Sequence, residues 1–110
     1  MKKTTFQLAK KVGDDIEREP RAGYYEPDVP GLVVAKVLPE APAKFQYWAI
    51  FHEESGRKVV GGGPGYKRSQ ALELLREIGG LADWTRSAEE LNNQNLMDDV
   101  GAVVYGQTPA

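Results

Sequence analysis

Apolar and polar residues alternate most clearly in the middle of the chain, where the pattern predicts two strands. Residues 32–38 are rich in valine and apolar on both sides, which is typical of a strand covered on both faces. Residues 45–53 alternate more strictly, so two sets of side chains would lie on opposite faces: Phe45, Tyr47, Ala49 and Phe51 on one, and Gln46, Trp48, Ile50 and His52 on the other. Residues 54–57 have the chemistry and length of a hairpin turn, so residues 58–61 should return as a third, antiparallel strand.

Helical spacing predicts a helix on each side of these strands. In residues 4–18 the apolar positions recur every three or four residues and predict an N-terminal helix that ends near Pro20. Residues 24–31 contain several breakers and predict an ordered loop. The helical spacing recurs in residues 67–78, and the glycines at 79 and 80 provide a C-terminal stop. The core face of this second helix would consist of Ala71, Leu74, Leu75 and Ile78.

The last third of the chain predicts only short elements. Ser87 and Glu90 have the spacing of a capping box, which predicts a short helix within residues 83–91. The polar sequence of residues 92–110 predicts a tail that is flexible or partly ordered, and residues 102–105 favour a short edge strand. The elements together predict one α+β domain over the whole chain. It would hold a small antiparallel three-stranded sheet with helices packed on one face, in the order α-β-β-β-α, plus the short C-terminal helix and the edge strand.

Composition then limits the classes of function. The chain has 110 residues, no Cys and one His, which excludes disulfides, thiolate metal sites and cysteine catalysis. A metal site at His52 would need neighbouring carboxylates, yet adjacent residues of a strand, such as Glu53, point to opposite faces. No apolar run approaches the roughly 18 residues of a membrane helix, and no apolar segment follows the N-terminal lysines. We therefore expect a cytoplasmic protein with no membrane partner.

The patterns that could indicate an active site fail their specific tests. The glycine run 61–65 precedes Lys67, but a Walker loop needs glycine immediately before the lysine, where Tyr66 stands. Ser55 and the other serines lack the sequence of a nucleophile elbow, so we expect His52 to form local hydrogen bonds at the end of its strand. We predict a protein that is not an enzyme and that uses no metal or cofactor.

Charge changes the picture further, because it is distributed unevenly. The formal net charge is −2 and the isoelectric point is about 5.4. Residues 1–58 carry ten Lys or Arg and nine Asp or Glu, whereas residues 59–110 carry four and seven. A domain that grips phosphate backbones over a large area usually has a high isoelectric point. The counts argue against such a broad basic surface and leave room for a local basic edge.

Aromatic residues interleaved with cations are the strongest remaining signal. They predict a small binding module that acts on nucleic acid or on a complex that handles it. In this prediction cations meet phosphates and aromatic rings stack on bases, with six candidate residues: Lys67, Arg68, Arg57, Lys58, Trp48 and Tyr66.

An alternative hypothesis is a protein-interaction module, such as an inhibitor or adaptor. Aromatic and basic residues also suit a protein-contact hot spot, and the acidic second half of the chain could face a basic partner. Such a module could be a homodimer that associates through an open sheet face or through the edge strand at residues 102–105.

A resemblance to a known family rests on the segment from Phe45 to Ile78. It contains a strand, the turn sequence Ser55-Gly56-Arg57-Lys58-Val59, a glycine stretch, and a helix that Lys67 and Arg68 open. With the order predicted over residues 4–78, this pattern resembles the double-stranded-RNA-binding domain. The resemblance implies that Lys67 and Arg68 contact phosphates across a groove.

A second resemblance rests on shorter segments. Residues 48–52 with Ser55 and Gly56, followed after a helix by residues 83–85, are similar to small uncharacterised proteins carried by phages and other mobile elements. This likeness implies an accessory, inhibitory or regulatory role.

Overall fold

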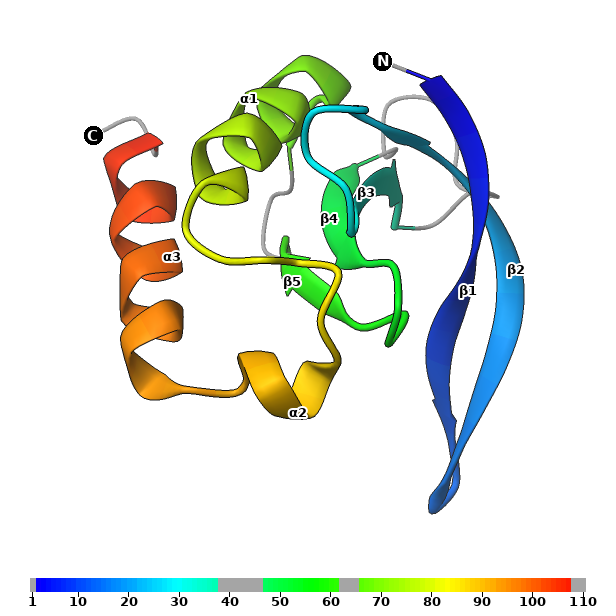
Figure 1. The fold of residues 1–110 in the computed structure, drawn as a ribbon. Helices are drawn as coiled ribbons and strands as arrows, with labels where there is room; N and C mark the ends of the chain where they lie inside the picture. The colour runs from blue at the N-terminus through cyan, green and yellow to red at the C-terminus, as the bar shows by residue number, and fades with distance from the viewer. Residues whose placement is uncertain (1, 38–46, 62–65, 108–110) are drawn as a thin grey trace.

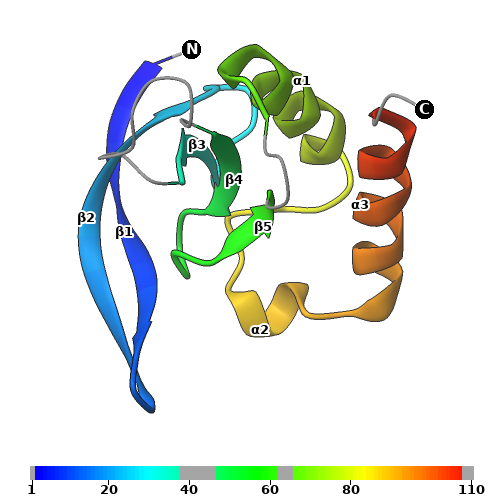
Figure 2. The same cartoon turned by 180° about the vertical axis from the view of Figure 1, so that it is seen from behind.

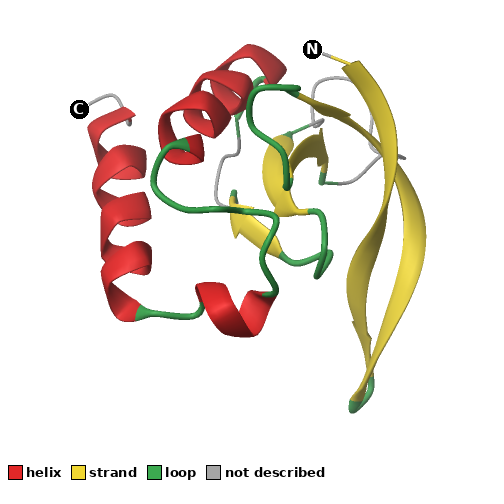
Figure 3. Cartoon of the chain, viewed as in Figure 1, coloured by secondary structure: helices red, strands yellow, loops and turns green. Residues whose placement is uncertain are grey.

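The computed structural model describes residues 2–37, 47–61 and 66–107, and within them the chain forms one five-stranded antiparallel sheet and three helices (Figures 1 and 3). The strands lie side by side in chain order: β1 (Lys2–Val12), β2 (Asp15–Tyr25), β3 (Leu32–Lys36), β4 (Trp48–His52) and β5 (Lys58–Val60). The helices follow the sheet in the sequence: α1 (Arg68–Gly79), α2 (Ala88–Leu91) and α3 (Gln94–Gln107). The α+β class is therefore confirmed, whereas the sheet has five strands rather than three.

The central strands and the helix after them form as predicted. The valine-rich segment becomes β3, the alternating segment becomes β4, and β5 returns antiparallel to β4 after the predicted turn. Helix α1 buries its four expected core residues and ends at Gly79, with Gly80 as its C-cap. The predicted strand residues Leu38, Phe45 and Gln46 lie outside the described residues.

The N-terminal helix was the wrong prediction, because residues 2–25 form the long hairpin β1–β2. Gly13 forms the turn with a φ of +62°, a conformation that glycine adopts without steric cost. Four apolar positions suggested a helical stripe: Phe6, Ala9, Val12 and Ile16. Of these only Phe6 is buried, and Ile16 is 59% exposed. Most of the hairpin is exposed, so its sequence shows the alternation of apolar and polar residues typical of a strand only near Phe6 and Leu8. Pro20 lies inside β2, opposite Gln7.

The C-terminal edge strand was also wrongly predicted, because residues 102–105 lie in α3. Leu96 and Val100, one helical turn apart, are buried against α1, with Val104 half-buried on the same side. The Asn93 side chain caps the helix, since its Oδ1 accepts a hydrogen bond from the Leu96 N–H at 2.7 Å. The two adjacent valines favoured a strand, and the apolar contact with α1 overrides that local preference. None of the described helices is long and apolar enough to span a membrane.

The β3–β4 strand pair is covered on both faces by different parts of the chain. The β1–β2 hairpin crosses one face, and the helices lie over the other (Figures 1 and 2). On the hairpin side, Phe6 and Phe51 have ring centroids 5.3 Å apart and pack with three smaller residues: Val33, Ala35 and Ala49. The sheet face that we expected to stay open is thus covered by the hairpin.

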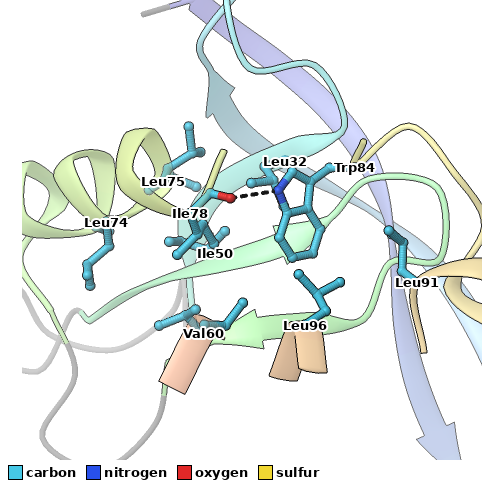
Figure 4. Close-up of a cluster of buried hydrophobic side chains, with 12 residues drawn as sticks. Leu32, Ile50, Val60, Leu74, Leu75, Ile78, Trp84, Leu91 and Leu96 are labelled. Atoms are coloured by element: carbon cyan, nitrogen blue, oxygen red, sulfur yellow. Dashed lines mark hydrogen bonds between the residues drawn. The ribbon is translucent and has the colours of Figure 1, made fainter. Parts of the chain in front are cut away.

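The larger core lies between the sheet and the helices. Side chains of α1 and α3 pack on Leu32 and Ile50 of the sheet, together with Trp84 from the segment after α1 (Figure 4). The Trp84 Nε1–H donates a hydrogen bond to the carbonyl of Ile78 at 2.9 Å. This bond satisfies the indole donor and a carbonyl at the end of α1, so the tryptophan closes the core.

The hairpin is held against the β4–β5 turn by contacts between backbones. The Ala9 N–H donates to the carbonyl of Gly56 at 3.0 Å. The guanidinium of Arg18 joins both sides, because it donates to the carbonyl of Gln7 at 2.9 Å and to that of Glu54 at 3.1 Å. A Cβ atom at Gly56 would overlap the backbone of Gln7 and Ala9, so this close approach needs glycine.

Paired substitutions test this contact. Gly56 and Gly13 both have positive φ, at +72° and +62°, but only Gly56 faces another backbone. Gly13→Ala should destabilise the protein by about 1 kcal/mol through backbone strain. Gly56→Ala should cost about 3 kcal/mol or more, because overlap adds to the same strain. Urea denaturation measures both values, and equal losses would contradict the contact.

Candidate nucleic-acid interface

Aromatic and basic side chains gather where β4 begins. Trp48 stands opposite Lys36 in the β3–β4 register, and the backbone N–H of Trp48 donates to the carbonyl of Tyr66 at 2.9 Å. The ring centroid of Tyr24, near the end of β2, lies 5.8 Å from that of Trp48. Helix α1 begins beside them at Arg68. Six residues define the basic–aromatic cluster: Tyr24, Lys36, Trp48, Tyr66, Lys67 and Arg68.

Two cations of the cluster lie over aromatic rings. The Cζ atom of Arg68 is 5.4 Å from the Tyr24 ring centroid and 5.9 Å from that of Trp48. The Lys36 Nζ atom is 5.8 Å from the Trp48 ring centroid. Such contacts contribute about 0.5–1 kcal/mol each at exposed sites. They hold positive charge beside rings that are only half-buried, so rings and cations share one surface.

The cluster is electropositive although the chain is acidic. Lys67 and Arg68 are exposed, and the first turn of α1 contains no acidic residue. Within the described part of the chain, no carboxylate forms an ion pair with Lys36, Lys67 or Arg68. The N-terminal end of a helix adds partial positive charge to such a surface. The cluster can therefore attract an anion and stack a flat ring in the same place.

The structure brings together only four of the six residues named from the sequence. Lys67, Arg68, Trp48 and Tyr66 belong to the cluster. Arg57 and Lys58 lie at the other end of β4, where Lys58 pairs with Phe51 and the Arg57 carbonyl accepts from the His52 N–H. Phe51 lies three residues along the strand from Trp48, which is about 10 Å.

Sequence reasoning missed two members of the cluster, Lys36 and Tyr24. Lys36 lies beside Trp48 only because of the β3–β4 register. The sequence between these strands did not predict that register. Tyr24 lies in a segment predicted as a loop, whereas it belongs to the end of β2 and pairs with Val34. The only sequence signal for it is the pair of adjacent tyrosines at 24 and 25.

His52 has a structural role at the far end of β4. It is 3% exposed, and its Nε2 lies 2.9 Å from the carbonyl oxygen of Trp84 and 2.8 Å from that of Arg86. Carbonyls only accept, so Nε2 carries the proton, and Nδ1 accepts from the Ser55 hydroxyl at 2.7 Å. The predicted local hydrogen bonding is confirmed, and the ring also ties β4 to the segment between α1 and α2.

His52 and Ser55 use their polar atoms for hydrogen bonds within the fold. Both ring nitrogens of His52 are engaged, and the Ser55 oxygen also accepts from the Arg57 N–H at 3.2 Å. Among residues 2–37, 47–61 and 66–107, no three His, Cys, Asp or Glu side chains come together as a metal site would require.

Replacing His52 tests the tie between β4 and the later segment. His52→Leu should destabilise the protein by about 1–3 kcal/mol, because it removes the donor from the buried carbonyl of Trp84 and from the part-buried carbonyl of Arg86. Ser55→Ala removes the partner of Nδ1 and the exposed acceptor of the Arg57 N–H, and it should cost less, about 1 kcal/mol. Urea denaturation of both variants gives the comparison. A His52→Leu variant as stable as the unchanged protein would refute the structural role.

A pH titration tests the turn at Asp83 and Thr85, which lies in the segment between α1 and α2. Hydrogen bonds from the Thr85 hydroxyl and N–H to the Asp83 carboxylate hold the pKa of Asp83 below its usual value of 3.8. A lowered folded-state pKa stabilises the fold above the ordinary pKa, and this stability is lost as pH falls through the folded value. Thr85→Val should raise the Asp83 pKa toward 3.8, measured by carboxyl NMR titration. An unchanged pKa would contradict the assignment.

Comparison with known proteins adds no relative from which a role could be transferred. No protein-family model, no curated protein and no solved structure matches the chain. The order of elements differs from α-β-β-β-α at its start, where two strands replace the first helix, and agrees from β3 to α1. The resemblance to the double-stranded-RNA-binding domain and the likeness to mobile-element proteins stay predictions.

Proposed function

We propose that the protein binds single-stranded nucleic acid through the basic–aromatic cluster, without catalysis. The observation that carries this proposal is the placement of Arg68 and Lys36 over the rings of Tyr24 and Trp48. Proteins that hold single strands combine a positive surface with aromatic side chains on which bases stack.

Each part of the cluster has a chemical role in this proposal. Lys67 and the exposed end of α1 meet a phosphate, where the free N–H groups of the first helical turn also point. A base stacks against Trp48 or Tyr66, and the flat guanidinium of Arg68 can stack on a second base. Lys36 contributes a further positive charge near the Trp48 ring.

A single strand suits this surface better than a duplex. Base-paired nucleic acid shows its phosphates and groove edges, whereas its base faces are covered by stacking. A cluster of three rings, Tyr24, Trp48 and Tyr66, offers stacking area that a duplex would leave unused. The proposal therefore differs from the groove contact that the family resemblance implies, although both use Lys67 and Arg68.

The homodimeric alternative loses the two surfaces that it needed. The hairpin covers the sheet face that was expected to be open, and residues 102–105 are helical rather than an edge strand. A protein partner would have to use a different surface.

Oligonucleotide binding tests the proposal. Fluorescence anisotropy with labelled oligo-dT, oligo-U and a matched duplex should give tighter binding to the single strands. The affinity should fall severalfold or more between 50 and 200 mM salt, because phosphate contacts release counterions. Lys67→Glu combined with Arg68→Glu should weaken binding at least about tenfold, and Trp48→Ala should weaken it about fivefold or more.

The control makes the same change of charge at a site away from the cluster. Lys10→Glu combined with Lys11→Glu alters two exposed lysines on the far part of the β1–β2 hairpin and should have a small effect. Binding that is insensitive to salt, or an equal loss in both double variants, would refute a role for the cluster.

A further inference from the structure

A hollow lies at the end of β4 that is remote from the basic–aromatic cluster. Its volume is about 320 Å³, and it is bounded by the β4–β5 turn, β5, α2 and the start of α3. Its apolar wall includes Val59, Leu91 and Met97, and Met97 is 45% exposed. His52 and Ser55 contribute its polar part, and Arg57 and Lys58 also line it.

A second hollow of about 320 Å³ continues the first toward the β1–β2 hairpin. The two share four lining residues: Ser55, Arg57, Ala88 and Glu89. The second ends at Ile16, whose side chain is 59% exposed. Figures 1 and 2 show α2 between the start of α3 and the lower part of the hairpin, along this path. The two hollows adjoin at these four residues, and we call them together the α2 groove; an exposed apolar side chain lines each of them, Met97 the first and Ile16 the second.

The edge strand of the sheet contributes to the lining of this groove. In the described part of the chain, β5 is the last strand of the sheet and no strand pairs with its outer side. Lys58 and Val59 of β5 line the groove. An unpaired strand edge presents backbone N–H and C=O groups to which an extended peptide can add as a further strand.

The charges that line the groove favour an acidic occupant. Arg57 and Lys58 are exposed, and within the described residues neither forms an ion pair. Arg18 adds a third cation near the hairpin end, and Glu54 and Glu89 contribute two carboxylates to the lining. The groove therefore has a positive balance in a chain of net charge −2.

We propose that the α2 groove binds an extended segment of a partner protein in which acidic residues lie between two apolar ones. The acidic side chains face Arg57 and Lys58, and one apolar side chain packs on Val59 and Met97. The other apolar side chain reaches Ile16. This binding is separate from the nucleic-acid proposal, because it uses the other end of β4.

Peptide selection tests the proposal. A random decapeptide library displayed on phage is panned against the whole protein, with the Arg57→Glu and Lys58→Glu double variant for counter-selection. The expected consensus has acidic residues flanked by apolar ones. A labelled consensus peptide should then bind at least about tenfold more weakly to the double variant, as measured by anisotropy, because two favourable charges become repulsive.

Two further variants make the test specific. Met97→Asp should also weaken the peptide about tenfold through lost apolar contact and added repulsion, and its exposed position keeps the fold intact. Lys67→Glu combined with Arg68→Glu should leave peptide binding unchanged, whereas it should weaken oligonucleotide binding. No enrichment of peptides, a basic consensus, or binding that is insensitive to Arg57, Lys58 and Met97 would overturn the proposal.

Discussion

The structure depends on one constraint, which is that the β3–β4 pair is apolar on both faces and must be covered twice. Val33 and Phe51 point to one side, and Leu32 and Ile50 to the other, all of them buried. No single element can cover both sides of a sheet. The chain therefore supplies the long β1–β2 hairpin for one face and three helices for the other, and Gly56 allows the hairpin to approach closely enough.

The same strand pair positions both candidate surfaces. Trp48 and His52 lie on the same side of β4, at its two ends. The beginning of α1 and the end of β2 meet at Trp48, which gathers rings and cations there. At the other end, His52 holds the segment that leads to α2, so the α2 groove forms between this segment, β5 and the hairpin. A five-residue strand thus separates the surfaces proposed for nucleic acid and for peptide.

The sequence predicted the elements whose burial is uniform and missed those held by distant contacts. Residues 32–36 and α1 show a steady apolar pattern because each packs along its length. The first 25 residues are mostly exposed, and their few apolar positions matched a helical period by coincidence. The contact that fixes Phe6 is with Phe51, which is distant in the sequence, so the local pattern could not indicate it. The candidate site was only partly predictable for a similar reason, since Lys36 and Tyr24 join the other four residues only through strand register.

The order of the strands has a consequence for how the chain folds. Each strand pairs with its neighbour in the sequence, so these pairings are local and little chain entropy is lost before contacts form. The approach of Ala9 to Gly56 is different, because it joins segments far apart along the chain. We therefore expect the meander to assemble early and rapidly, with docking of the hairpin onto the β4–β5 turn as the slower topological step.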